Sequence, residues 1–327
     1  MKIKIDVLKE KILQTLTANG FSQNDSSDIA DVLLWCDMSG INIMGTMKLT
    51  GTEPLQNIKP IHEIKTEHET KLSALLNAGA NPAPLAAQQA TNIAIEKAKE
   101  HGFAIVGVHN TFSSTLAQAY YAQKIAKENL IGIVMSGSPA VFAPFDSIDP
   151  LFGTNPIGFG FPTNEEPIVF DMTTSAMAWY ALIRAKNLGE KIPPNSAIDK
   201  DGNPTTDPVA AMEGAMLPFD RGYKGAGLGM VIEILTGPLV KAAYVDVSPE
   251  SEYGTTVIAI DPGLLIDVAD FKAANSDLIK KIKASRKKVG SNNIRLPGER
   301  ASKSYNNAKA SGEVDVDENI LRELRYI

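Results

Sequence analysis

Three glycine-containing loops have the composition of a site that binds an anion or a cofactor. The loop at residues 136–139 (Ser-Gly-Ser-Pro) follows an apolar run, and its hydroxyl and backbone N–H groups could bind phosphate or ribose oxygens. The loop at residues 153–156 (Gly-Thr-Asn-Pro) offers a hydroxyl and an amide, and its proline favours an extended Asn155. Each loop taken alone is also typical of an ordinary turn, so both interpretations stay open.

The third loop, residues 222–229 (Gly-Tyr-Lys-Gly-Ala-Gly-Leu-Gly), leads into a helix and invites comparison with the dinucleotide-binding fingerprint. That fingerprint needs a strand directly before it and a carboxylate about 20 residues later on the next strand. This sequence offers neither of them. Lys224 is the one charged side chain of the loop and could pair with a phosphate or a carboxylate, whereas close packing of the helix is the alternative explanation of the glycines.

Only one of the four histidines is placed like a catalytic residue. His109 follows an apolar run that reads as a strand ending at Val108. No Ser/His/Asp or paired-carboxylate arrangement stands out, so the sequence gives no support for hydrolase chemistry. The chain has a single cysteine, Cys36, which lies in an apolar run. One cysteine can form neither an intramolecular disulfide nor a zinc site built on cysteine pairs. We therefore predict no metal site.

Apolar spacing predicts the elements that must position these loops. A strand–helix–strand pattern over residues 103–135 favours an α/β core. Residues 198–204 are expected to form a strand that enters a tight turn. The expected helices cover residues 6–18, 24–38, 85–101, 115–129, 228–243, 270–289 and 317–325, and the expected strands cover residues 103–108, 130–135, 157–161, 168–171 and 257–262.

Composition narrows the classes of protein that fit. A chain of 327 residues with 44% apolar and 21% charged residues predicts about two domains with ordinary cores. Its net charge of −6 argues against a nucleic-acid partner, and the basic run at residues 280–288 reads as a solvated helix face, with a phosphate or partner site as the alternative. No apolar run approaches the roughly 18 residues of a membrane span, so we expect no membrane association and a cytoplasmic location.

Six separated segments, in this order, resemble the malate/L-lactate dehydrogenase-like family of nicotinamide-dependent oxidoreductases. The resemblance covers roughly residues 5–327 and implies an α/β fold that is not a Rossmann fold, with a mixed central sheet. It also implies NAD or NADP as cofactor, a homodimer, a cofactor-binding core at residues 76–289, and a helical unit from residues 1–75 plus 290–327. The segments are residues 153–157 (Gly-Thr-Asn-Pro-Ile), 170–175 (Phe-Asp-Met-Thr-Thr-Ser), 199–208, 224–228 (Lys-Gly-Ala-Gly-Leu), 259–262 (Ala-Ile-Asp-Pro) and 297–299 (Pro-Gly-Glu).

The same resemblance implies which residues contact the cofactor or organise its site. All of them lie in or beside the matching segments or the loop at residues 136–139. They are Ser138, Thr154, Asn155, Pro156, Asp171, Met172, Thr173, Lys224, Gly225 and Glu299.

The catalytic part of the chain departs from the family pattern. Members typically read Asp-x-Arg-Gly-x-x-Ser-His-Gly-x-x-Arg-Leu where this chain has residues 37–49, so Met44 replaces a histidine and Lys48 replaces the arginine expected to hold a substrate carboxylate. Lysine keeps that charge but loses the bidentate fork. Ser114 occupies the position of a second histidine. A base beside the substrate accelerates such a reaction by about 10²–10⁴-fold, and neither Met44 nor Ser114 can act as one. A further hypothesis is therefore that His109 serves as the base.

Two functions of different classes follow from this pattern. The first is an oxidoreductase that transfers a hydride between a nicotinamide cofactor and a small 2-hydroxy/2-oxo acid, of the malate, lactate or ureidoglycolate type, or a related imine, with Lys48, Ser114 and His109 as catalytic candidates. The second is an inactive paralogue that binds the cofactor or regulates another process. An enzyme must place a titratable group beside the nicotinamide, whereas a binding protein need not. A third interpretation, an unrelated Rossmann dehydrogenase, lacks the motif context.

Overall fold

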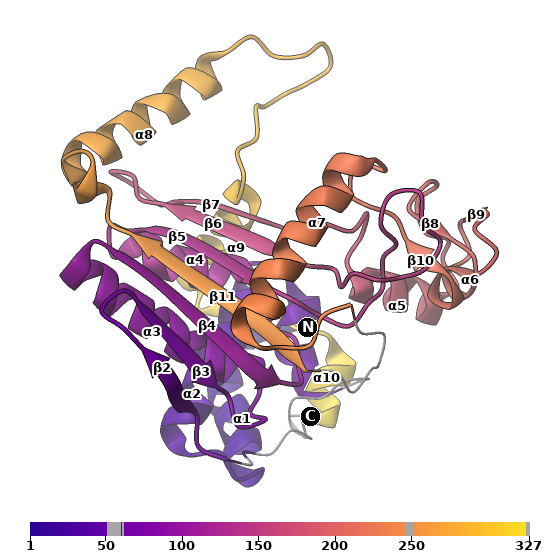
Figure 1. The fold of residues 1–327 in the computed structure, drawn as a ribbon, viewed down its shortest axis with the longest axis horizontal. Coiled ribbons are helices and arrows are strands. Elements are labelled where there is room, and N and C mark those ends of the chain that lie inside the picture. The colour runs from indigo at the N-terminus through magenta and orange to yellow at the C-terminus, as the bar shows by residue number, and fades with distance from the viewer. Residues whose placement is uncertain (51–59, 61, 246–251, 325–327) are drawn as a thin grey trace.

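The computed structural model describes residues 1–50, 60, 62–245 and 252–324, and a mixed sheet of seven strands forms its centre (Figure 1). Only the second and third strands of the sheet run parallel, and every other neighbouring pair is antiparallel. The mixed sheet confirms the predicted α/β class. In spatial order the strands are β2 (Lys65–Glu69), β3 (Ser73–Asn77), β4 (Phe103–Thr111), β11 (Tyr253–Ile260), β5 (Ile131–Ser136), β6 (Ile157–Phe161) and β7 (Ile168–Met172).

Strand β11 lies between the two strands of the predicted strand–helix–strand unit. It pairs antiparallel with β4 on one side and with β5 on the other. The central place of β11 agrees with its burial, because residues Gly254–Val257 are all buried between the neighbouring strands and the helices. Strand β4 also runs three residues beyond the predicted end at Val108, since Thr111 still pairs with Tyr253, so His109 lies within the strand.

Helices cover both faces of the sheet (Figure 1). Helices α3 (Ala83–His101) and α4 (Gln118–Lys127) pack on one face, and α2 (Gln23–Met38) lies against them. Helix α7 (Tyr223–Thr236) packs on the opposite face, over β5 and β11. No helix of the described residues is long and apolar enough to cross a membrane.

The position predicted for α7, residues 228–243, was wrong at both ends. The helix begins five residues earlier because its glycines permit close packing, which was the alternative explanation of this loop. A Cβ atom at Gly229 would lie 2.6 Å from the ring of Phe142, and one at Gly225 would lie 2.4 Å from the carboxylate of Asp220. The helix ends where Gly237 and a proline interrupt it.

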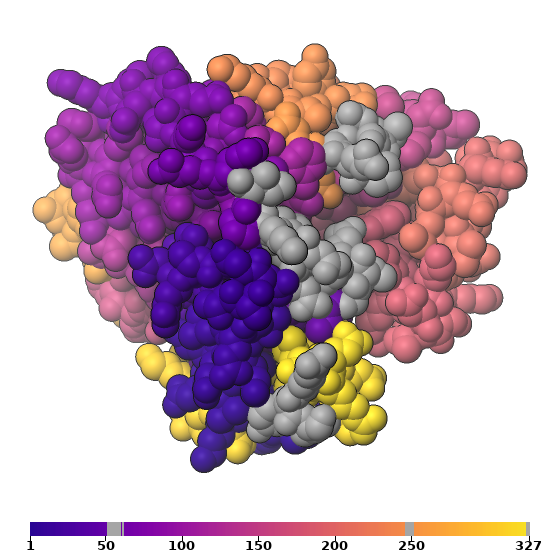
Figure 2. Space-filling view, turned by 90° about the horizontal axis from the view of Figure 1, so that it is seen from below, coloured from indigo at the N-terminus to yellow at the C-terminus, as the bar shows by residue number. Residues whose placement is uncertain are grey.

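Segments from both ends of the chain pack together into a helical unit. Figure 2 shows the first and last segments side by side. Helix α1 (Ile5–Ala18) packs on α2, and β1 (Lys2–Lys4) pairs antiparallel with β12 (Glu313–Asp315). Helices α9 (Glu299–Ser311) and α10 (Glu318–Glu323) complete the unit. Strand β2 and the first residues of β3 fall within residues 1–75 and belong to the central sheet.

A smaller lobe follows β7 and has its own apolar cluster around Phe142, Leu182 and Met216. It contains α5 (Trp179–Leu188), α6 (Pro208–Glu213) and a small sheet of β8 (Ala197–Ile198), β9 (Pro204–Thr205) and β10 (Ala215–Met216). Helix α8 (Val268–Ala284) extends away from the sheet and has no buried residue, which fits its predicted solvated face.

Candidate functional site

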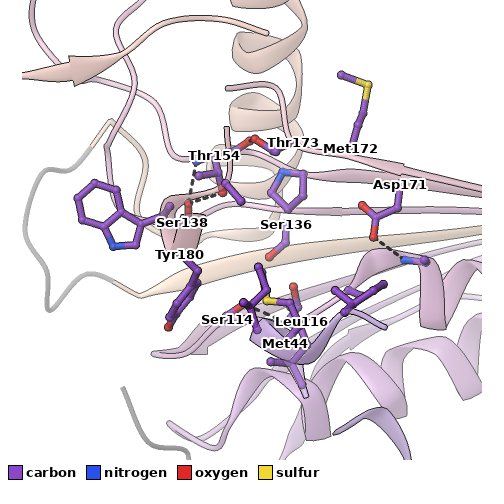
Figure 3. Close-up of a pocket in the computed structure, with 18 of the residues that line it drawn as sticks. Met44, Ser114, Leu116, Ser136, Ser138, Thr154, Asp171, Met172, Thr173 and Tyr180 are labelled. Carbon is purple, nitrogen blue, oxygen red and sulfur yellow. Dashed lines mark hydrogen bonds between the residues drawn. The ribbon is translucent and has the colours of Figure 1, made fainter. Parts of the chain in front are cut away.

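A cavity of about 870 Å³ lies where the sheet, the helical unit and the smaller lobe meet (Figure 3). Segments from all three parts line it. The sheet and its loops provide residues 136–141, 154, 156 and 169–173, the helical unit provides residues 41, 43, 44, 296–298 and 300–302, and the smaller lobe provides residues 178–180. The loop before α4, residues 114–117, adds to the wall. The predicted cofactor loops at residues 136–139 and 153–156 thus meet here with the segment at residues 170–173, whereas none of the described residues 222–229 of the third predicted loop lines the cavity.

Hydrogen bonds join the hydroxyl-bearing loops at this cavity (Figure 3). The backbone N–H of Thr154 donates to the Ser138 hydroxyl at 3.0 Å. The Thr173 hydroxyl donates to the Thr154 carbonyl at 3.0 Å. A Cβ atom at Gly153 would lie 2.3 Å from the Ser138 carbonyl oxygen, so glycine permits this close approach. The structure thus brings Ser138, Thr154 and Thr173 together, and Pro156 lies in the same wall.

Asn155 supports the loop from behind and does not line the cavity. Its side chain is buried, and its amide donates to the Gly229 carbonyl at 3.0 Å and to the Glu233 carboxylate at 2.7 Å. Burial raises the pKa of Glu233, while the Val245 N–H and the Asn155 amide act in the opposite direction. The Asn155 backbone has a positive φ of 39°, which asparagine tolerates better than most residues. Asn155 therefore fixes the cofactor loop to α7.

Asp171 and Met172 are neighbours on β7 and both line the cavity, with their side chains on opposite sides of the strand (Figure 3). The Asp171 carboxylate accepts the Ala119 N–H at 2.9 Å and so caps the N-terminus of α4. Desolvation raises the pKa of the Asp171 carboxyl group to about 6, although hydrogen bonds from the N–H groups of Ala119 and Gln118 lower it.

Three other predicted cofactor residues do not line the cavity. Lys224 is exposed at the start of α7, and the Gly225 N–H donates to the Asp220 carboxylate at 3.1 Å. Glu299 begins α9 and accepts hydrogen bonds from Lys283 and from a backbone N–H, and the Lys283 ammonium is the main cause of its lowered pKa. Its neighbours Gly298 and Arg300 do line the cavity.

The two positions where the family resemblance implies histidines both belong to the cavity wall. They are Met44 and Ser114 (Figure 3). The Ser114 hydroxyl accepts the Leu116 N–H at 3.1 Å. His109 is not brought to them, because its Nε2 lies 3.2 Å from the Glu67 carboxylate and its Nδ1 lies 3.9 Å from that of Glu252. That histidine joins a carboxylate cluster at the β2 side of the sheet.

Lys48 is not itself a lining residue of the cavity, but it contacts an aromatic ring that is. It is buried in a short 3₁₀ helix, Thr46–Leu49, and its Nζ lies 3.0 Å from the centroid of the Tyr180 ring. Tyr180 itself lines the cavity. The sequence did not point to Tyr180 or Arg300, because neither α5 nor α9 was predicted.

Asp37 fixes the segment that carries Met44 and Lys48. It is buried at the end of α2, and its carboxylate accepts the Thr46 N–H at 2.8 Å and the Thr46 hydroxyl. Burial raises the pKa of Asp37 to about 7, and the two hydrogen bonds lower it. A Cβ atom at Gly45 would lie 2.0 Å from the Asp37 carboxylate, so glycine is required there.

The fold and the cavity define an α/β protein that gathers hydroxyl-bearing loops and a helix N-terminus around one cleft without a Rossmann fingerprint. Among the described residues, no group of three His, Cys, Asp or Glu side chains is arranged to hold a metal ion. The family model of malate/L-lactate dehydrogenase matches residues 3–325. The chain belongs to this family of oxidoreductases.

Relatives in this family match over nearly their whole length. The malate/(S)-sulfolactate dehydrogenase of Methanothermus fervidus is 36% identical, over 97% of this chain and 94% of that protein. The ureidoglycolate dehydrogenase (NAD(+)) of Escherichia coli is 30% identical, over 97% of this chain and 93% of that protein. The crystal structure of malate dehydrogenase from Entamoeba histolytica superposes with a TM-score of 0.92, covering 99% of this chain and 96% of that one at 23% identity, which shows the shared fold.

Proposed function

We propose that this chain is a dehydrogenase that transfers a hydride between NAD or NADP and a small 2-hydroxy/2-oxo acid of the malate, lactate or ureidoglycolate type. Relatives named for malate, sulfolactate and ureidoglycolate support this class of substrate. The observation that carries the proposal is the convergence of the Ser138, Thr154 and Thr173 loops on one cavity. The inactive paralogue remains the alternative function.

The cavity fits a nicotinamide nucleotide, which supplies or accepts the hydride when bound. Its volume of about 870 Å³ lies within the usual range for cofactor and ligand sites, about 300–1,000 Å³. Ser138, Thr154 and Thr173 offer hydroxyl groups to ribose or phosphate oxygens. The N-terminus of α9, with Arg300 in the wall, suits a phosphate, because free N–H groups and the helix dipole favour an anion there.

Positive charge at the other side of the cavity suits an anionic substrate. Lys48 lies against the Tyr180 ring, and the segment before Lys48 contributes the apolar side chains of Ile41, Ile43 and Met44 to the wall. We propose Lys48 as the main attraction for the substrate carboxylate and Ser114 as a hydrogen-bonding group beside it. His109 forms no part of the cavity wall, so we assign it no role in hydride transfer.

Fluorescence titration with NADH and NADPH, followed by a turnover screen with pyruvate, oxaloacetate, glyoxylate-type acids and a cyclic imine, tests the proposal. We expect saturable binding and turnover of at least one acid. Binding without turnover would favour the inactive paralogue. Failure to bind either nucleotide would overturn the cofactor assignment and leave only the inherited fold. We further propose the cytoplasm, where these nucleotides are available, as the location of the protein.

We propose a second copy of the chain as the partner of the outer face of α7. Tyr223, Met230 and Ile234 recur at helical spacing on this face and are each at least half exposed, and Val231 beside them is 46% exposed. A contiguous apolar face of this kind is typical of a protein interface. Homodimerisation, as the family resemblance implies, would bury it.

Replacing Ile234 by glutamate is therefore expected to convert a dimer into a monomer, because two charged groups would be buried at a symmetric interface. Light scattering during gel filtration gives the molar mass. Ile266→Glu is a matched control, since Ile266 is 46% exposed but lies before α8, away from α7. A wild-type chain that elutes as a monomer at micromolar concentration would contradict the proposed dimer.

A further inference from the structure

The cavity lacks the histidines that would move a proton during hydride transfer. A carbonyl oxygen that gains negative charge must receive a proton, and Met44 and Ser114 carry no group that titrates near neutral pH. Among the described residues, the titratable or charged side chains that line the cavity are Asp171, Tyr180, Tyr253 and Arg300. The proton must come from one of these groups or from water.

We propose that Tyr180 is the catalytic acid and base of the reaction, an inference that rests on the proposed dehydrogenase function. Tyr180, Met44 and Ser114 line the same cavity (Figure 3). Tyr180 thus belongs to the wall that also holds the two positions where the family resemblance implies histidines. Arg300 holds its proton at every accessible pH, so it cannot serve.

Two positive fields act on the Tyr180 phenol and stabilise its deprotonated form. The Lys48 ammonium lies 3.0 Å from the ring centroid, in a buried position where its charge is weakly screened. Tyr180 is also the second residue of α5, a ten-residue helix whose N-terminus carries partial positive charge. Both fields make the phenol a stronger acid and so bring it nearer the pH at which it can exchange protons.

Three charged groups on elements around Tyr180, namely Arg184, Asp171 and Asp37, have partners of their own. On its own helix, Arg184 lies one turn further along and pairs with Glu190 at 3.9 Å, and both side chains are exposed. Asp171 lies in the cavity wall on β7, where its carboxylate is occupied in capping α4. Asp37 lies behind the segment that carries Lys48 and is bonded to Thr46. The Lys48 ammonium, by contrast, lies directly against the Tyr180 ring.

The chemical step balances with these groups. In the reducing direction the carbonyl carbon of the 2-oxo acid receives the hydride from the reduced nicotinamide, and the electron pair of the C=O π bond moves to oxygen. That oxygen takes the Tyr180 phenolic proton, and the tyrosinate regains a proton from water. In the oxidising direction the tyrosinate accepts the substrate hydroxyl proton as the hydride leaves for the oxidised nicotinamide.

Tyr180→Phe is expected to lower kcat at neutral pH by about 10²–10⁴-fold, the usual contribution of acid–base catalysis. NADH affinity and substrate KM should stay within about threefold, because phenylalanine keeps the ring under Lys48. The pH profile of kcat should lose the limb that reports the phenol. Tyr253→Phe is the competing variant, and a loss of kcat there with full activity in Tyr180→Phe would overturn the proposal.

A spectroscopic titration tests the same residue without cofactor or substrate. Ultraviolet absorbance of tyrosinate should show one tyrosine that ionises below the ordinary range near pH 10. This ionisation should be absent in Tyr180→Phe and should move to higher pH in Lys48→Met. If no such ionisation disappears in Tyr180→Phe, the proposal is wrong whether or not the enzyme turns over. A wild-type chain inactive with every acid would instead contradict the proposed function and leave the titration to decide the role of Tyr180.

Discussion

Replacing Asn155 by aspartate is expected to destabilise the protein by about 3–5 kcal/mol at pH 8, the usual cost of leaving a buried charge uncompensated. The new carboxylate would stand where an amide now donates to Glu233 at 2.7 Å and to the Gly229 carbonyl at 3.0 Å. Both neighbours are acceptors, so a donor would be replaced by a group that repels them. The loop carrying Thr154 should shift with it, and NADH affinity should fall.

The destabilisation of Asn155→Asp should depend on pH. Two carboxyl groups that share one site have a raised pKa, and burial already raises that of Glu233. A raised pKa means that stability is retained at acid pH, where one group is protonated and can donate, and is lost as the pH rises. Chemical denaturation at pH 5 and pH 8 measures the difference.

Asn195→Asp is the matched control for this variant. Asn195 also has a positive φ, 58°, but its side chain is exposed. Substitution there should change the free energy of unfolding by no more than about 0.5 kcal/mol at either pH. Equal destabilisation of the two variants would show that backbone conformation, rather than the contact with Glu233, decides the result.

Asp37 is expected to make the wild-type protein less stable as the pH rises from about 4 to 7. Its pKa is raised by burial to about 7, from 3.8, so the folded state holds this proton more tightly than the unfolded state. The corresponding stabilisation is present below pH 4 and is lost as the pH rises to about 7, by at most about 4 kcal/mol. Asp37→Asn should remove this dependence, because an amide oxygen can still accept both hydrogen bonds from Thr46.

Unfolding by urea at intervals between pH 4 and pH 8 checks this prediction, with the difference between wild type and Asp37→Asn as the readout. Asp31→Asn is a control on the same helix, because Asp31 is exposed and pairs with Lys9 at 3.0 Å. An exposed pair contributes at most about 1 kcal/mol. Parallel curves for wild type and Asp37→Asn would contradict the assignment of the proton to Asp37.

Elements with a strong apolar pattern could be predicted from the sequence, and their neighbours in the sheet could not. The predicted helix at residues 6–18 and strands at 157–161 and 168–171 are confirmed within a residue or two as α1, β6 and β7. Periodicity reports which face of an element is buried, but it does not report which partner buries it. The central position of β11 therefore could not be predicted, and α9, with Ala308 as its one buried residue, gave almost no signal.

The residues of the candidate site also fall into two groups, those that the sequence could predict and those that it could not. Hydroxyl and glycine composition, with the family resemblance, predicted the loops that carry Ser138, Thr154 and Thr173, because backbone geometry at a turn leaves a local signal. The contact of Lys48 with Tyr180 joins two segments far apart in the chain. Nothing in either segment reports it, so the aromatic partner of the lysine could be found only in three dimensions.

The pairing of β1 with β12 has a consequence for how the protein is made. Lys2 lies opposite Asp315 and Ile3 opposite Val314, so β1 cannot pair until β12 has been synthesised. At about 5–20 residues per second, the ribosome needs roughly 15–60 s to produce that partner. The α9 wall of the cavity also emerges late, since it begins at Glu299. A nascent chain can thus form its central sheet before it can complete the helical unit and the cavity, because these two require α9 and β12.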